Sequence, residues 1–294
     1  MSNILKKIWI LPLFFILYSC ASTPEPEQVA EAEGKSENVN SAAQEKAPVW
    51  VTVEVDEFFV AQETVKYDDG FIDGYRLYDY NDAGQILKKS HIGSDERIIS
   101  EELYSYNGDG LLVASQFFSG GDQISYSEFT YNADMLLIEE SYFNPEGQLL
   151  AVSSYEYDNQ GRISKWISGD SGGIPMMYTE YEYKKDMLMQ MTYFMPSGEM
   201  EGFTKLEYKD GQLVSEASYN ANSKLEKKTE YTIENGLVVS EAYYIGNNLI
   251  RTVEFEYDDA GNAVIERTIN RHGDVIDIVE KEYVVFTVKR TVQQ

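Results

Sequence analysis

The stretch Tyr104-Ser-Tyr106-Asn-Gly-Asp-Gly110 places two aromatic residues, one position apart, directly before a short polar turn. Similar stretches begin at Tyr78, Tyr155 and Phe255. Alternate residues of a β-strand point to the same face, so each aromatic pair is predicted to lie on one face of a strand that ends at the turn. A motif that recurs at a fixed spacing indicates repeated supersecondary units, each of which buries its apolar face against its neighbours.

The turn residue of this motif recurs roughly every 25 residues. It stands at Gly84, Gly110, Asp134, Gly161, Asp186, Gly211, Gly236 and Gly261. Gly, and less readily Asp, can adopt the left-handed backbone conformation that closes a short hairpin loop. An apolar residue follows two positions after each turn residue, and a second loop, such as Asn144-Pro-Glu-Gly147, comes later in each unit. Each repeat is therefore predicted to contain two antiparallel strands and two short turns.

The chain is accordingly predicted to be all-β, an antiparallel β-meander of roughly 16 to 18 strands. A sheet of that length cannot stay flat, so we expect a coiled single-layer sheet or a loosely closed, barrel-like one. The β-repeat domain is predicted at 49–294, with a divergent N-terminal cap at 49–75 and the repeats at 76–285. Charge on both strand faces leaves no continuous band for lipid, which argues against a transmembrane barrel.

The N-terminus carries the features of an export signal. Lys6 and Lys7 precede about ten apolar residues, which is short for a membrane span. The sequence Leu17-Tyr-Ser-Cys20 then resembles the bacterial lipobox, which implies that residues 1–19 are a cleaved signal peptide and that Cys20 is acylated. An ordinary secretory signal and an uncleaved anchor are the alternatives. Residues 20–48 are predicted to form the lipidated cysteine and a disordered acidic tether, because this stretch has no aromatic residue with which to form a core.

Composition excludes several classes of function. The formal charge of −26 would repel a phosphate backbone, so nucleic-acid binding is not expected. The chain has one cysteine, and its only histidines are His91 and His272. The chain therefore has almost none of the cysteine and histidine residues that a catalytic triad, a Cys–His pair or a zinc site requires. We therefore predict no enzyme activity, no catalytic residue, no cofactor and no metal site.

Two repeat families resemble parts of this chain. The Tyr-x-Tyr-Asp-x-x-Gly stretches at Tyr155–Gly161 and Phe255–Gly261 resemble the YD repeat of Rhs and teneurin-type shells. The stretch 198–213 is similar to MORN-variant repeats of bacterial antitoxin-annotated and lipoprotein chains. Both resemblances imply a β-hairpin repeat. Neither implies an activity here, because a shell of the first kind needs a cargo domain and an antitoxin needs a cytoplasmic partner.

Two sets of side chains are candidate sites. Glu139, Glu216, Glu241 and Glu266 lie five positions after their turn residues. We expect the last three to form a solvated stripe on the face opposite the Leu row, which is the set of apolar residues that stand two positions after the turn residues. Neighbouring acids such as Glu139 and Glu140 point to opposite faces of a strand, so neither member can assist the other as an acid–base pair. The 23 tyrosines are predicted to pack across strands, with a binding platform as the alternative.

Together these features predict a lipid-anchored, non-enzymatic repeat protein of the bacterial cell envelope. The residues after Cys20 are Ala21 and Ser22 rather than Asp, which resembles lipoproteins sorted to the outer membrane. The partners predicted are the membrane, through the N-terminal lipid, and an unidentified protein or glycan that contacts the extended β-surface. The alternative is a structural envelope component or assembly factor with no soluble ligand.

Overall fold

The computed structural model describes residues 50–293, which form one antiparallel sheet of 18 strands. The predicted signal peptide (1–19), Cys20 and the tether (20–48) lie outside the described residues. The strands are β1 (Trp50–Lys66), β2 (Ile72–Tyr80), β3 (Ile86–Gly93), β4 (Ile98–Tyr106), β5 (Leu112–Ser119), β6 (Asp122–Tyr131), β7 (Leu137–Phe143), β8 (Leu149–Tyr157), β9 (Ile163–Asp170), β10 (Pro175–Lys184), β11 (Met187–Phe194), β12 (Met200–Lys209), β13 (Gln212–Asn220), β14 (Leu225–Glu234), β15 (Leu237–Ile245), β16 (Asn248–Tyr257), β17 (Ala263–Asn270) and β18 (Val275–Gln293).

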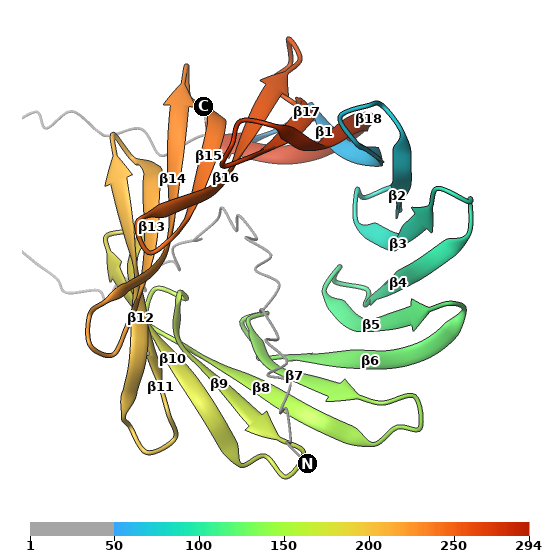
Figure 1. The fold of residues 1–294 in the computed structure, drawn as a ribbon. Coiled ribbons are helices and arrows are strands. Elements are labelled where there is room, and N and C mark those ends of the chain that lie inside the picture. The colour runs from blue at the N-terminus through green and yellow to red at the C-terminus, as the bar shows by residue number, and fades with distance from the viewer. Residues whose placement is uncertain (1–49, 294) are drawn as a thin grey trace, which may run out of the picture. The chain divides into compact units, whose positions relative to one another are not determined.

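The strands follow one another around a ring (Figure 1). Each strand pairs with the next in sequence, as β2 does with β3 and β9 with β10, and β1 pairs with β18. The predicted all-β meander is therefore confirmed, and the sheet closes completely into a barrel. All the strand pairings that close the barrel are made between residues 50–293, so closure uses no strand from outside this range. The part of the chain that the structure describes holds no helix long and apolar enough to cross a bilayer.

The hairpin loops follow the predicted turn chemistry. Each of the six predicted turn glycines has a positive φ, between 74° and 85°. The first residue of many loops is Asn or Asp, and its side-chain oxygen accepts hydrogen bonds from the backbone two and four positions later, as Asn81 does from Ala83 and Gln85. These local bonds hold the loop closed.

The structure moves two of the predicted turn positions by one residue. Asn132 accepts the same two hydrogen bonds as Asn81, and the left-handed residue of its loop is Met135, with φ of 60°, rather than Asp134. In the loop that contains Asp186, the left-handed residue is Lys185, with φ of 54°. The expectation that Asp takes this conformation is therefore wrong at both positions, although both lie in loops. The reason is that the loop's hydrogen bonds set its backbone, whatever side chain stands there.

Each pair of neighbouring strands also contains one β-bulge. In the β4–β5 pair, Ser105 lies opposite Ala114 and Tyr106 lies opposite Leu112, which leaves Val113 as an extra residue. A bulge of this kind reverses the alternation of faces along its strand. Residues before and after it that differ by an odd number of positions therefore share a face.

We call the face that carries the aromatic pairs, such as Tyr104 and Tyr106, the tyrosine face. The second tyrosine of most pairs donates its hydroxyl to a backbone carbonyl at the start of the preceding strand, at 2.6 to 3.0 Å. These tyrosines are Tyr80, Tyr106, Tyr131, Tyr157, Tyr183, Tyr257 and Tyr283. The aromatic pairs thus join neighbouring strands by specific hydrogen bonds as well as by packing.

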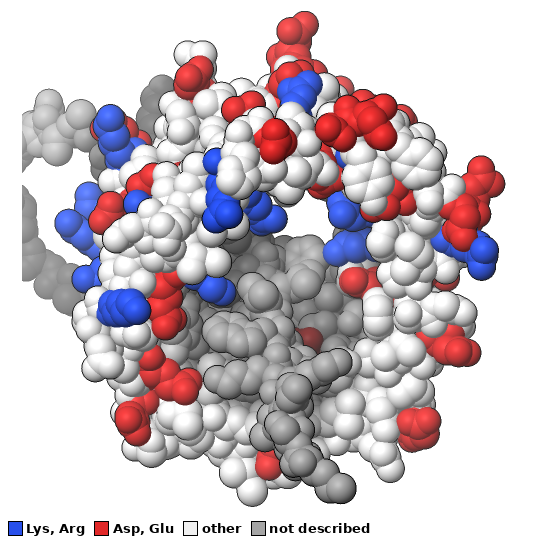
Figure 2. Space-filling view, in the orientation of Figure 1, with Lys and Arg blue, Asp and Glu red and all other residues white. Residues whose placement is uncertain are grey.

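The tyrosine face is the inner face of the barrel. It carries most of the buried side chains, including Thr204, which is 1% exposed, and Thr179, at 3%. Burial, and then the charge on Tyr131 two strands away, raise the pKa of Tyr106. Burial likewise raises the pKa of Tyr155, and the charge on Tyr181, which is also two strands away, raises it further. Side chains two strands apart approach one another where a curved sheet makes them converge, and the described residues surround a hollow in Figure 2.

A charged network on the tyrosine face joins the strands where the barrel closes. Glu63 of β1 accepts hydrogen bonds from Arg76 at 3.0 Å and from Tyr78 at 2.9 Å, both on β2. Lys281 of β18 lies 3.5 Å from Glu63 and also pairs with Glu266 of β17. Glu63 is only 9% exposed. Burial acts to raise its pKa, but the hydrogen bonds from Arg76 and Tyr78 outweigh it and hold the pKa below its ordinary value.

Candidate functional site

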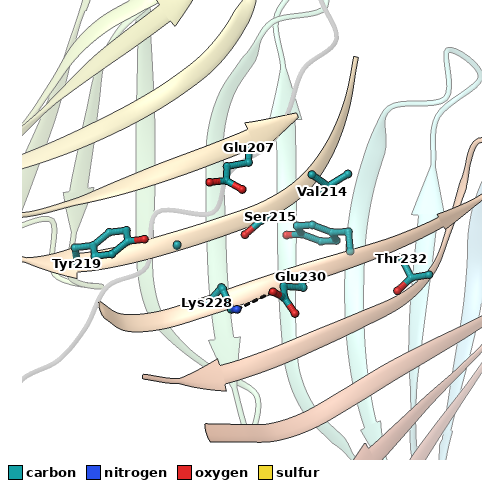
Figure 3. Close-up of a pocket in the computed structure, with 9 residues that line it drawn as sticks. Glu207, Val214, Ser215, Tyr219, Lys228, Glu230 and Thr232 are labelled. Carbon is teal, nitrogen blue, oxygen red and sulfur yellow. Dashed lines mark hydrogen bonds and ion pairs between the residues drawn. The ribbon is translucent and has the colours of Figure 1, made fainter. Parts of the chain in front are cut away.

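A groove lies on the outer face of the sheet, over β12, β13 and β14 (Figure 3). Its volume is about 550 Å³. It is lined by Glu207, Val214, Ser215, Ala217, Tyr219, Lys228, Glu230, Tyr231 and Thr232. Strand register places Glu207 opposite Ser215 and Ser215 opposite Glu230, so these three side chains form a row across neighbouring strands. We call this site the outer groove.

An aromatic stack forms one end of the outer groove. The rings of Phe203 and Tyr219 lie 5.0 Å apart at an angle of 18°. Tyr126 and Phe143 stack in the same way at 4.7 Å on β6 and β7, as do Tyr178 and Phe194 at 4.8 Å on β10 and β11. The repeat therefore places the same pair at one end of several hairpins. Only half-buried, these rings keep part of their surface available for contact.

An ion pair crosses the middle of the groove. Lys228 lies 2.6 Å from Glu230 on the same strand, and its ammonium sits 4.6 Å from the centre of the Tyr244 ring. The hydrogen bond between the two charged groups raises the pKa of Lys228 and lowers that of Glu230, so both are charged at neutral pH. Burial raises the pKa of Tyr231, whose ring lies on the tyrosine face beneath the groove, to about 12.

The outer groove combines flat aromatic surface with hydrogen-bonding groups of both kinds. Tyr219 presents a ring, Lys228 presents a donor, and Glu230 presents an acceptor. Sugar rings and extended peptides are recognised by such a combination, since both carry apolar edges beside many polar groups.

A second cavity, of about 320 Å³, lies on the tyrosine face at the rim where β13 and β15 end and β14 and β16 begin. We call it the rim pocket. It is lined by Glu216, Ser218, Lys227, Lys228, Thr229, Tyr243, Tyr244, Ile245, Ile250 and Arg251. Register places Thr229 between Glu216 and Tyr243, and Tyr243 opposite Arg251, so these side chains share the inner face. The guanidinium of Arg251 sits 4.5 Å from the centre of the Tyr243 ring.

The structure corrects the predicted carboxylate stripe. Glu216, Glu241 and Glu266 lie opposite Leu206, Tyr231 and Phe255, which places them on the tyrosine face together with the Leu row. They are partly buried rather than solvated, and burial raises the pKa of Glu216. The cause is the bulge between the turn and the glutamate, which adds one residue and reverses the predicted face.

Glu139 does not belong to this set. It lies opposite Thr130 and is exposed on the outer face, whereas Glu140 lies opposite Phe129 on the tyrosine face. This follows from the turn at Met135, because Glu140 is five positions beyond that residue. Burial raises the pKa of Glu140, although hydrogen bonds from Ser127 and Tyr155 act to lower it.

The remaining predicted positions do not converge on a site. Cys20 lies outside the described residues. His91 is on β3, and His272 is in the exposed loop between β17 and β18. Among residues 50–293, no cluster of three or more His, Cys, Asp or Glu side chains is arranged to hold a metal ion. In the loops, side-chain oxygens such as that of Asp258 accept hydrogen bonds from the loop's own backbone.

No protein-family model matches this chain, and no curated protein matches it. Among solved structures, a porin-like protein from Bacteroides uniformis is similar over 77% of this chain and 96% of its own, with 13% identity and a TM-score of 0.43. A porin-like protein from Bacteroides vulgatus is similar over 77% and 99%, with 13% identity and a TM-score of 0.35.

The TcdB2-TccC3 complex is similar over 75% of this chain, with 12% identity and a TM-score of 0.27, and the match spans 16% of its chain. At these values the likenesses identify no family. The resemblance to YD and MORN-variant repeats stays a prediction from the sequence.

Proposed function

We propose that this protein is a non-enzymatic binding barrel of the bacterial cell envelope, anchored through Cys20, that recognises a glycan or an extended peptide in the outer groove. The observation that carries the proposal is the groove itself, in which Tyr219 and the Lys228–Glu230 pair are presented together on the outer face.

Other features of the chain support this function. A groove on the outer face stays accessible to a large partner when the barrel is closed. The inner face is not accessible to such a partner. The predicted lipid at Cys20 and a tether of 28 residues would hold the barrel roughly 30 Å from the bilayer on average. That spacing suits the contact of an anchored protein with a polymer or with another protein.

The replacement Tyr219→Ala is expected to weaken binding about tenfold, because it removes the ring on which an apolar ligand face would stack. The measurement is a screen of residues 21–294, which include the whole barrel, against immobilised glycans and peptides, followed by titration of each ligand found. Glu230→Gln is expected to weaken the binding of the same ligands, because it removes a charged hydrogen-bond acceptor.

The matched control is Tyr126→Ala, because Tyr126 stacks on Phe143 as Tyr219 does on Phe203 but lies away from the groove. This variant should bind as the unmodified protein does. Equal losses in Tyr126→Ala and Tyr219→Ala would show that the effect is on folding and would contradict a site in the groove.

The anchor is tested by Cys20→Ser in the full chain. The unmodified protein is expected in the membrane fraction and labelled by a palmitate analogue, and the variant is expected unlabelled and released, because two or more acyl chains are needed for stable attachment. A variant that stays in the membrane fraction would contradict lipid anchoring. The alternative function, a structural component without a soluble ligand, is favoured if the barrel resists protease until the outer membrane is permeabilised and the screen finds no ligand.

A further inference from the structure

The rim pocket has a composition unlike that of the chain as a whole. Three of its lining residues, Lys227, Lys228 and Arg251, are basic, and one, Glu216, is acidic. The full chain carries 50 acidic and 24 basic residues, so a pocket with more basic than acidic side chains does not follow from composition. Figure 2 shows basic side chains gathered on the part of the ring formed by β12–β16.

The cations of the pocket are held in position by aromatic rings. Arg251 lies over the ring of Tyr243 on the inner face, and Lys228 lies over the ring of Tyr244 on the outer one. A guanidinium that is stacked on a ring keeps its N–H groups directed sideways, where they can donate two parallel hydrogen bonds to one anionic group. Ser218 and Thr229 add hydroxyl groups to the same wall.

The outer end of the pocket is apolar. Ile245, the last residue of β15, is 58% exposed, and Ile250 on β16 is 39% exposed. Ile250 is the extra residue of a bulge, since Tyr243 pairs with Arg251 and Tyr244 pairs with Leu249. The bulge turns this isoleucine toward the pocket that Arg251 also lines.

The same bulge position carries an exposed apolar residue further around the rim. Ile276 is the extra residue between Val275 and Asp277 on β18 and is 47% exposed. Ile250 and Ile276 therefore occupy equivalent bulge positions near the start of β16 and β18. An exposed apolar side chain beside a charged pocket, as Ile250 is, suits a ligand that has both an apolar and an anionic part.

We propose that the rim pocket binds an anionic amphiphile, with Arg251 and Lys227 holding a phosphate or carboxylate head group and with Ile245 and Ile250 contacting its aliphatic chain. The size of the pocket agrees with this ligand, because about 320 Å³ corresponds to roughly ten water-sized groups, enough for a head group and several methylenes. Arg251 and Lys227 are not part of the outer groove, although Lys228 lines both sites.

The test compares three probes in calorimetric titrations of residues 21–294, each below its critical micelle concentration. Dodecyl phosphate carries the head group and the chain, inorganic phosphate carries the charge alone, and dodecyl maltoside carries the chain alone. Dodecyl phosphate is expected to bind at least tenfold more tightly than either of the others. The burial of two methylenes accounts for the difference from inorganic phosphate, and the charged hydrogen bonds of the head group account for the difference from dodecyl maltoside. Equal affinity for dodecyl phosphate and inorganic phosphate would show a simple anion site and overturn the proposal.

Variants locate the binding. Arg251→Gln is expected to weaken the binding of dodecyl phosphate at least tenfold and to leave the binding of dodecyl maltoside unchanged. Ile250→Ser is expected to weaken the binding of both. Lys209→Gln is the matched control, since Lys209 is an exposed cation at the other end of β12. If Arg251→Gln unfolds, Lys227→Gln takes its place. A loss in Lys209→Gln equal to that in the pocket variants would overturn the assignment, as would binding that none of the pocket variants changes.

Discussion

The replacement Gly202→Ala is expected to destabilise the barrel by about 3 kcal/mol. A β-carbon at this position on β12 would lie 2.4 Å from the carbonyl oxygen of Tyr219 and 3.4 Å from the α-carbon of Asn220. Both belong to the backbone of β13, which is fixed by its pairing with β12, so neither atom can move aside without breaking the ladder. Urea unfolding followed by circular dichroism measures the loss.

Gly108→Ala is the control for this prediction. Gly108 has no positive φ, and an added β-carbon would meet nothing within 4 Å. This variant is expected to unfold within about 0.5 kcal/mol of the unmodified protein. A similarly small change in Gly202→Ala would contradict the close approach of β12 and β13 at that point.

The replacement Glu63→Gln is expected to lower the stability of the barrel by about 2 kcal/mol at pH 7. Glutamine can still accept one hydrogen bond, but it leaves the charges of Arg76 and Lys281 without their carboxylate at the seam between β1, β2 and β18. The effect should depend on pH. The carboxyl of Glu63 has a pKa below its ordinary value of 4.5 in the folded protein, so its contribution to stability is fully present above pH 4.5 and is lost as the pH falls through the folded-state pKa.

Unfolding free energies of the two proteins should therefore differ at pH 7 and converge below pH 4.5. The control is Glu182→Gln, because Glu182 is exposed on the outer face of β10 and away from the seam. A difference for Glu63→Gln that is constant from pH 7 to strongly acidic pH would show that the carboxylate charge is not what stabilises the seam.

The local structure of this barrel is predictable from its sequence because the signals are local. A turn such as Asn81-Asp-Ala-Gly84 determines its own backbone through bonds within five residues, and the aromatic pairs fix which residues of the preceding strand share a face. Repeated along the chain, these signals predict the number of strands and their antiparallel order.

What the sequence does not reveal depends on bulges and on distant pairing. A bulge residue such as Val214 looks like any other strand residue, yet it reverses the faces beyond it and moves Glu216 from the expected outer stripe to the inner face. The outer groove was not predicted for a related reason. Tyr219 is visible as an aromatic residue at a repeated position, but its stack with Phe203 and its place in one groove with Glu230 depend on the register of three strands.

The pairing of β1 with β18 also has a kinetic consequence. Lys66 and Glu280, which form an ion pair across this seam, are separated by 214 positions in the chain, whereas every hairpin joins residues that are near neighbours. Bringing such distant segments together costs more chain entropy than closing a hairpin, and contacts of this kind form slowly. We therefore expect the hairpins to form early and the ring to close last. Until the final strand arrives, the growing sheet has two unpaired edges on which other chains can add, so the time before closure is when this protein is most open to misassembly.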